Sequence, residues 1–314
     1  MLKRVVVFLL GYVFVGVIVL PLCVTVLCGG FVKDAEFEPI QETRNQENLV
    51  RLEDLATTEL EEYIIGVVSA EMPVSFDMEA LKAQAVAART YQVRKMLENA
   101  STGVLYDVGQ AYMTPEELKN RWQDNYTAYT DKIRSAVKAT EGEIMVYEGE
   151  PILAVFHAQS AGKTENAENV WQNTLPYLKS VDIPQDNLAP NNEVQLELTQ
   201  EEVWRRLQSL CEITANADEL TLIVAERSSA GYVQKVSVTG GGTLRGREVR
   251  EALGLRSANF TVEKKDGVFH FVTKGYGHGA GMSQHGANFL AQDGMDYHEI
   301  LKYFYQGISF ERFS

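Results

Sequence analysis

The sequence predicts an α+β fold: an N-terminal transmembrane helix followed by a mixed domain of helices and antiparallel hairpins. Helical periodicity dominates the first part of the chain after an apolar N-terminus, and paired strand patterns interrupted by helices follow. This order differs from the regular alternation of strands and helices that produces a parallel sheet. With 314 residues, 45% of them hydrophobic, the chain can bury a sizeable core.

Residues 1–32 are expected to form a cytoplasmic tip and a transmembrane anchor. No charged residue occurs from Val5 to Val32, a run long enough to cross the ~30 Å hydrocarbon core of a bilayer. Lys3 and Arg4 precede the run and acidic residues follow Lys33, so the positive-inside rule places the N-terminus in the cytoplasm. A cleaved signal peptide is the alternative, although its apolar segment is usually shorter.

The remaining chain is expected to contain a tether and one extracytoplasmic domain. Residues 33–47 are polar and acidic without periodicity, which indicates a tether. Residues 48–314 form the main domain, and residues 193–218 are expected to be a helical excursion from it.

Capping signals and helical periodicity predict the helices of this domain. The first begins with a capping box at Thr58 and Glu61 and ends before Pro73, because proline cannot continue a helix. Asp77 can cap the second, which runs to about Glu98. Further helices are expected after Thr114 and at 126–140, 199–210 and 245–253.

Short apolar runs separated by turn residues predict the strands. Hairpins are expected at 144–157, 221–239 and 259–274, and Lys265-Asp266-Gly267 is a recognisable hairpin turn in the third.

Charge and cysteine content exclude several function classes. The net charge of −14 disfavours nucleic acid as a partner, because phosphate binding depends on an excess of Lys and Arg. A neutral or cationic polymer fits better. Cys211 stands alone outside the apolar N-terminus, so the main domain can form neither an internal disulfide nor a thiolate zinc site.

Glu71 is the first candidate for a functional residue. It lies at the end of an apolar helix, four residues after Val67 on the buried stripe, so burial would desolvate its carboxylate. Such a group is either a working acid or one partner of a structural ion pair. Lys82 and Arg89 share a face of the next helix and are the candidate partners, although they could equally form a solvated stripe or bind substrate.

A second candidate is the glycine-rich stretch Gly275–Ala287. Four glycines within residues 275–281 would let the backbone approach a ligand closely. A dinucleotide loop lacks its βαβ frame, and a P-loop lacks its Gly-Lys-Ser/Thr end. A metal site using His157, His278 and His285 is possible, although the spacing is not His-Glu-x-x-His. The remaining interpretation is a saccharide-binding loop beside Glu71.

These stretches carry a resemblance to a known family. Glu62–Tyr91 and Gly275–Ala287 resemble the two signature stretches of the stage II sporulation protein D family, which also includes amidase-enhancer proteins. The resemblance extends over nearly all the extracytoplasmic chain, including Phe156–Glu165, but not over residues 193–218. Members of the sporulation type are single-pass membrane proteins facing the space between mother cell and forespore. The resemblance therefore implies a location at that septum.

The resemblance also implies an activity and its residues. The family implies a peptidoglycan lytic transglycosylase acting in engulfment, which cleaves the MurNAc-GlcNAc bond of glycan strands to give 1,6-anhydroMurNAc ends. Glu71 would be its single catalytic acid. Substrate contacts are expected from Arg89, Lys82, His157, Lys163, His278, Gln284 and His285. A sporulation amidase and a membrane scaffold protein are the implied protein partners.

No cofactor or metal is expected. Some family members bind zinc through a histidine and cysteines after the first hairpin, but this chain has only His157 there. Two alternatives to the transglycosylase stay open. The first is a non-catalytic, peptidoglycan-binding amidase enhancer, and the second is a zinc-dependent hydrolase built on His157, His278 and His285.

Overall fold

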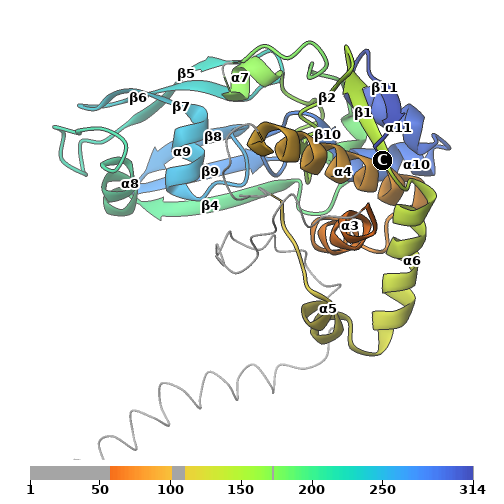
Figure 1. Ribbon diagram of the computed structural model, residues 1–314. Coiled ribbons are helices and arrows are strands. Elements are labelled where there is room, and N and C mark those ends of the chain that lie inside the picture. The colour runs from red at the N-terminus through yellow and green to blue at the C-terminus, as the bar shows by residue number, and fades with distance from the viewer. Residues whose placement is uncertain (1–56, 101–109, 172, 314) are drawn as a thin grey trace, which may run out of the picture. The chain divides into compact units, whose positions relative to one another are not determined.

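The computed structural model describes residues 57–100, 110–171 and 173–313 (Figure 1). The expected anchor at 1–32 and tether at 33–47 lie outside these residues. Within the described part of the chain, no helix combines the length and the apolar composition needed to cross a bilayer. Helices and mainly antiparallel strands are mixed, as the α+β prediction requires.

The first hydrophobic core forms around a central helix, α4 (Met78–Ala100), which follows α3 (Thr57–Glu71). Asp77 caps α4 as predicted, since its Oδ1 accepts a hydrogen bond from the amide of Glu79 at 2.9 Å. Small side chains such as Ala85 and Ala88 are fully buried, which lets other elements approach α4 closely. Its neighbours are α3, α6 (Tyr126–Ala139), α10 (Gln284–Gln292), α11 (Tyr297–Phe304) and β1 (Glu143–Tyr147).

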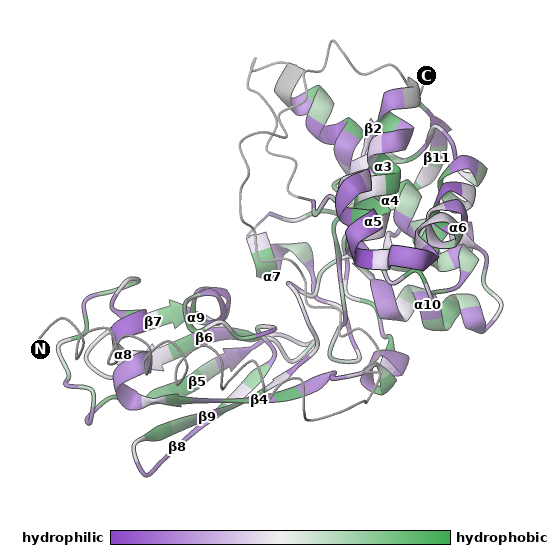
Figure 2. Ribbon diagram, turned by 90° about the horizontal axis from the view of Figure 1, so that it is seen from below, coloured by the Kyte–Doolittle hydropathy of each residue, from purple (hydrophilic) through white to green (hydrophobic). Residues whose placement is uncertain are grey.

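A hydrophilic helix, α5 (Pro115–Trp122), precedes α6 (Figure 2). The helix expected after Thr114 is confirmed, and Thr114 forms a capping box: its hydroxyl accepts from the amide of Glu117, and Glu117 accepts from the amide of Thr114. Within α5 only Leu118 is buried. A short 3-10 turn, η4 (Gln123–Asn125), joins α5 to α6.

A second hydrophobic core lies under two antiparallel three-stranded sheets. The first sheet has the order β4-β9-β8 and the second β5-β6-β7. Both hairpins predicted here are confirmed, as are helices near 199–210 and 245–253. The elements are β4 (Glu193–Thr199), α8 (Gln200–Leu207), β5 (Leu222–Arg227), β6 (Val233–Val238), β7 (Gly242–Arg245), α9 (Gly246–Leu253), β8 (Phe260–Lys265) and β9 (Val268–Lys274).

The expectation of a helical excursion at 193–218 is wrong for its first part. Strand β4 pairs with β9 from Glu193 opposite Lys274 to Thr199 opposite Val268, so it belongs to the sheet. Its Val194, Leu196 and Leu198 alternate with polar residues, which is the pattern of a half-buried strand. Within this stretch the α-helix is limited to α8, which is capped by Thr199 and Glu202.

The hairpin predicted at 144–157 is shorter than expected. β1 pairs with β2 (Glu150–Pro151) over two residue pairs and with β11 (Ser309–Arg312) on its other side. Phe156 and His157 form β3, which pairs in parallel with β10 (Met282–Ser283). This long-range pairing brings the segment after residue 155 beside the glycine-rich stretch. The short elements α7 (Ala167–Trp171) and η5 (Pro184–Leu188) follow β3.

Candidate active site

Glu71 is the last residue of α3 and lies beside the start of α10. Pro73 follows it and the chain turns into α4, as the sequence predicts. The amide of Ala111 donates a hydrogen bond to Glu71 Oε1 at 2.7 Å, and the Gln284 side chain also bonds the carboxylate. Burial nevertheless raises the pKa of Glu71 from its ordinary 4.5 to about 7, because desolvation outweighs both hydrogen bonds.

The structural ion pair considered for Glu71 is not formed. Among the described residues no cationic side chain lies within 4 Å of its carboxylate. Lys82 instead pairs with Glu79 at 2.6 Å and lies 5.7 Å from the ring centre of Tyr297. Glu71 is therefore a partly exposed carboxylate with a raised pKa and without a counter-charge.

Arg89 has a different place from the one expected. Its side chain is fully buried, and it bonds both carboxylate oxygens of Glu61 at 2.6 and 2.8 Å. A further donor reaches the carbonyl oxygen of Glu143 at 3.1 Å. Because substrate cannot reach a buried guanidinium, the expected substrate contact of Arg89 does not fit this structure. Arg89 joins α3, α4 and the chain before β1.

Glu61 is the partner that sequence reasoning missed. Its spacing from Thr58 matches a capping box, but its carboxylate bonds Arg89 and accepts from the amide of Gly142 at 3.0 Å. The Thr58 side chain of the expected capping box lies outside the described residues. Glu61 adjoins Leu60 on the buried face of α3. A carboxylate at such a position usually has a charged partner, so the sequence did indicate a buried ion pair.

The two candidate stretches meet at Glu71. Gln284 is buried at the start of α10 and donates to Gln84 Oε1 at 3.4 Å in addition to bonding Glu71. The ring of His285 packs edge-on against Phe76 with centroids 4.9 Å apart. Burial, helped by Arg256, lowers the pKa of His285 to about 4, so this histidine is neutral at neutral pH.

A tyrosine pair that the sequence did not point to also lies near Glu71. Tyr63 stacks on Tyr112 with ring centroids 5.2 Å apart. Burial raises the pKa of Tyr63, and the charges of Tyr112 and Glu71 raise it further. Its hydroxyl is buried and has no hydrogen-bond partner among the described residues. Tyr63 lies about two helical turns before Glu71, and this spacing is what in the sequence indicates that the two share a helix face.

The glycines of the loop have a different role from the one expected. Gly275, Gly277, Gly279 and Gly281 all have positive φ, between +72° and +108°. A Cβ on Gly277 would lie 2.7 Å from the Cβ of His157, and one on Gly281 would collide with the Val155 carbonyl oxygen. The space that these glycines leave is filled by the chain itself, so they let the loop pack closely against residues 155–161 and, at Gly279, against Tyr232.

His157 and His278 lie together at the other end of this loop. Their ring centroids are 5.6 Å apart, and Trp171 packs on His278 at 5.0 Å. The Nδ1 of His157 bonds the carbonyl oxygen of Ala280 at 3.1 Å. His278 Nδ1 accepts from the Ala280 amide at 3.1 Å, and the ring also bonds the backbone of Phe156. Burial lowers the pKa of His157 to about 4 and that of His278 well below 6.5.

The three histidines do not form the metal site of the hydrolase alternative. The His278 ring bonds the backbone of Ala280 and of Phe156, and His285 packs on Phe76. Within the described ranges, no group of three or more His, Cys, Asp or Glu side chains is arranged to hold a metal ion.

Lys163 lies in the polar loop after β3. Its ammonium is 3.2 Å from Asp182 Oδ1, and its backbone forms a bridge with the same residue. The side chain is partly exposed, so it stays available to a ligand.

Comparison with known proteins places this arrangement in a family. The family model described as stage II sporulation protein matches residues 50–147, which include Glu71. Stage II sporulation protein D of Bacillus subtilis (strain 168) is 40% identical over 276 residues, covering 86% of this chain and 77% of the relative. The protein of that name from Bacillus amyloliquefaciens is 43% identical over 256 residues, covering 79% and 73%. The chain belongs to the stage II sporulation protein D family.

Two further matches concern the C-terminal half of this family member and a relative with a different name. A model described as a domain of unknown function matches residues 191–281, from just before β4 to the loop before β10. A Bacillus subtilis (strain 168) protein named amidase enhancer is 28% identical over 291 residues, covering 77% of this chain and 39% of the relative.

Proposed function

We propose that this protein is a peptidoglycan lytic transglycosylase in which Glu71 is the catalytic acid. The observation that carries the proposal is the state of Glu71: partly exposed, without a counter-charge, and with its pKa raised to about 7 by burial. A carboxyl group with that pKa is partly protonated at neutral pH and can donate its proton.

One carboxylate suffices for this reaction. Most glycosidases need a second acid to activate water or to attack the sugar. In a lytic transglycosylase the 6-hydroxyl of N-acetylmuramic acid attacks its own anomeric carbon, so the substrate supplies the nucleophile at high effective molarity. Glu71 protonates the departing glycosidic oxygen, and the resulting carboxylate accepts the proton of the 6-hydroxyl. The products are a free 4-hydroxyl on one strand and a 1,6-anhydro end on the other.

The neighbours of Glu71 suit this proton transfer. The Ala111 amide fixes one carboxylate oxygen at 2.7 Å. Gln284 bonds the carboxylate through a neutral amide, which stabilises the ionised product without the large pKa reduction that a cation would cause. His285 is neutral and packed on Phe76, so it does not compete as an acid at neutral pH.

The proposal is tested with the full chain and peptide-free glycan strands, whose ends are identified by mass spectrometry. We expect 1,6-anhydro ends from the wild-type protein and at least about 10²-fold slower release from Glu71→Gln. Glu62→Gln is the matched control, because Glu62 is exposed on the same helix. It should retain the wild-type rate.

Different products would overturn the proposal. Reducing ends would indicate hydrolysis by water, and full activity of Glu71→Gln would remove Glu71 from the chemistry. Cleavage that a chelator abolishes would require a metal ion.

A non-catalytic amidase enhancer is the second candidate, favoured by the similarity to the Bacillus subtilis protein of that name. In that case the protein would leave glycan strands intact and would accelerate peptide removal by an added amidase. The same acceleration by wild-type and Glu71→Gln proteins, without anhydro ends, would support this candidate.

The proposed place of action is the septum between mother cell and forespore during engulfment. The protein would be held by a single transmembrane anchor at residues 1–32, with its N-terminus inside and residues 48–314 outside. Its proposed protein partners are a sporulation amidase and a membrane scaffold protein. The uncharged run from Val5 to Val32 supports the anchor.

A further inference from the structure

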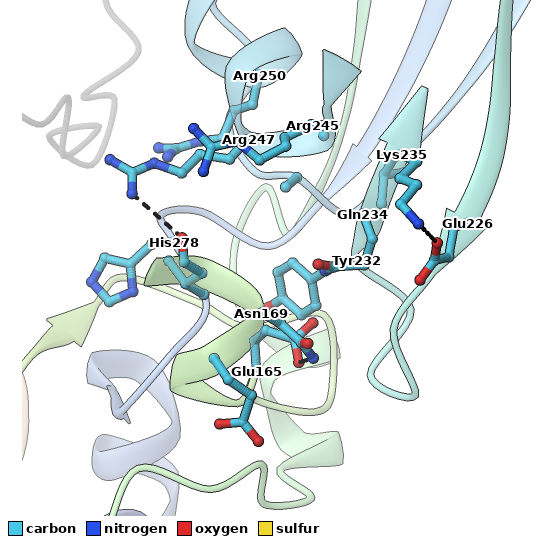
Figure 3. Close-up of a pocket in the computed structure, with 15 residues that line it drawn as sticks. Glu165, Asn169, Glu226, Tyr232, Gln234, Lys235, Arg245, Arg247, Arg250 and His278 are labelled. Atoms are coloured by element: carbon cyan, nitrogen blue, oxygen red, sulfur yellow. Dashed lines mark hydrogen bonds and ion pairs between the residues drawn. The ribbon is translucent and has the colours of Figure 1, made fainter. Parts of the chain in front are cut away.

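A cavity of about 250 Å³ lies away from Glu71, where α9 and β6 face the segment Glu165–Val170 (Figure 3). Residues 191–281 supply α9 and β6, so the domain of unknown function forms one wall. A volume of this size is somewhat below that of typical ligand pockets, which run from about 300 Å³ upward, and suits one small chemical group.

Most charges around this cavity are neutralised within the protein. Arg245 pairs with Glu248 at 2.8 Å, and Lys235 pairs with Glu226 at 2.5 Å. Arg247 pairs with Glu251 at 2.8 Å. These cations therefore have limited capacity to bind a further anion.

Arg250 is different from these neighbours. It projects from the same helix, is half-buried, and has no carboxylate within 4 Å among the described residues. Within the described part of the chain, its hydrogen bond runs from Nε to the carbonyl oxygen of Arg256 at 3.3 Å, and its two terminal nitrogens have no acceptor there. Burial lowers its pKa, because desolvation penalises the cation. A desolvated guanidinium whose two terminal nitrogens lack acceptors favours an incoming anion.

Glu165, on the facing wall, limits the kind of anion. Its side chain is buried, and Oε1 accepts from the Asn166 amide and the Asn169 side chain, each at 2.8 Å. Its Oε2 is buried without a partner among the described residues. Because Oε2 is inaccessible and the carboxylate points away from Arg250 in Figure 3, Glu165 acts on a ligand through its charge and repels a doubly charged phosphate more strongly than a single carboxylate.

We propose that this cavity binds a singly charged carboxylate group through Arg250, while the negative charge of Glu165 on the opposite side disfavours more highly charged anions. The proposal rests on the proposed function in taking peptidoglycan as the ligand. Peptidoglycan offers two sources of this chemistry: the lactyl carboxylate of N-acetylmuramic acid and the terminal carboxylate of a peptide. The domain of unknown function would thereby hold the polymer while Glu71 acts elsewhere on it.

The test is isothermal titration calorimetry with the full chain carrying Glu71→Gln. The first pair of probes is N-acetylmuramic acid and N-acetylglucosamine, which lacks the lactyl acid. The second pair is N-acetyl-alanyl-alanine and its C-terminal amide. We expect the acid of at least one pair to bind at least about tenfold more tightly than its neutral partner, and the pair that does so identifies the source. Added salt should weaken this binding.

Substitutions test whether the preference for the acid probe over its neutral partner arises in the cavity. Arg250→Gln should abolish the difference between acid and neutral probe, and Arg250→Lys should retain part of it. Arg205→Gln is the matched control, since Arg205 is exposed on α8 and does not line the cavity. Equal binding of acid and neutral probes in both pairs would overturn the proposal without any variant. Unchanged acid preference in Arg250→Gln would overturn it too. Cleavage by the wild-type protein is scored separately, so failure of this site is distinguishable from failure of the Glu71 chemistry.

Discussion

Glu61 and Glu71 lie on the same helix, and the fold treats their carboxylates in opposite ways. Glu61 is paired with buried Arg89 through two short hydrogen bonds and also accepts from the Gly142 amide. Among the described residues, the hydrogen-bond donors to Glu71 are neutral: the Ala111 amide and the Gln284 side chain. The first carboxylate joins secondary-structure elements, whereas the second, with a pKa of about 7, is partly protonated near neutral pH.

The difference shows how burial has two consequences. A buried carboxylate that a bidentate arginine bonds is costly to leave without that partner, so the pair holds the fold together only while both partners are present. A buried carboxylate without a cation shifts its pKa upward, which costs stability at high pH but supplies an acid. Each of the following predictions tests one side of this comparison.

Breaking the pair of Glu61 and Arg89 should have the largest effect on stability. Arg89→Met leaves the Glu61 carboxylate buried without its cation, so we expect a loss of about 3–5 kcal/mol in the free energy of unfolding, measured by urea denaturation. Glu98→Gln removes a more exposed pair with Arg94 and Lys95 and should cost less than about 1 kcal/mol. Equal losses in the two variants would contradict the structural role of Arg89.

Glu71→Gln should have the opposite effect and stabilise the protein at alkaline pH. The folded-state pKa of about 7 lies above the ordinary 4.5, so ionising Glu71 opposes folding. The penalty is absent below pH 4.5, grows as pH rises toward 7, and is complete above it. The stability gain of Glu71→Gln relative to wild type should therefore increase between pH 5 and pH 8, by up to about 3 kcal/mol. A gain that does not change with pH would contradict the raised pKa.

The pH dependence of cleavage should report the same group. Because Glu71 must be protonated to act, kcat/KM should fall about tenfold per pH unit above pH 7. The same residue then serves as base, so no second carboxylate has to be ionised at the start. His285, with its pKa lowered to about 4, should not cause a change in kcat/KM near neutral pH. A rate that increases from pH 6 to pH 8 would show that Glu71 acts as an initial base.

Local signals in the sequence were sufficient for much of the fold. Pro73 and Asp77 predicted the end of α3 and the cap of α4, and Thr114 and Thr199 predicted where α5 and α8 begin. The turn before β9 was predicted by Asp266 and Gly267, which both have positive φ. Each of these signals acts within a few residues, where composition restricts the backbone directly.

Long-range partners could not be predicted in the same way. Glu61 has the spacing of a capping residue, yet its partner Arg89 lies on another helix. The Ala111 amide that bonds Glu71 carries no side-chain signal at all. Glycines at 275–281 look alike in sequence whether they approach a ligand or the chain's own strand. The parallel pairing of β3 with β10 joins residues far apart in the chain.

The smallest predicted effect concerns Gln284, which ties the glycine-rich stretch to Glu71. Its side chain lowers the pKa of Glu71 by bonding the ionised form, so Gln284→Leu should raise that pKa and move the alkaline limb of the cleavage profile to higher pH. Gln284→Glu would add a second carboxylate and should raise it further through like-charge repulsion. Asn288→Ala is the matched control on α10, because Asn288 bonds the Asp77 amide at 2.8 Å and not Glu71. If the limb moves equally in the Asn288 variant, α10 acts through its position as a whole and the specific contribution of the Gln284 amide is excluded.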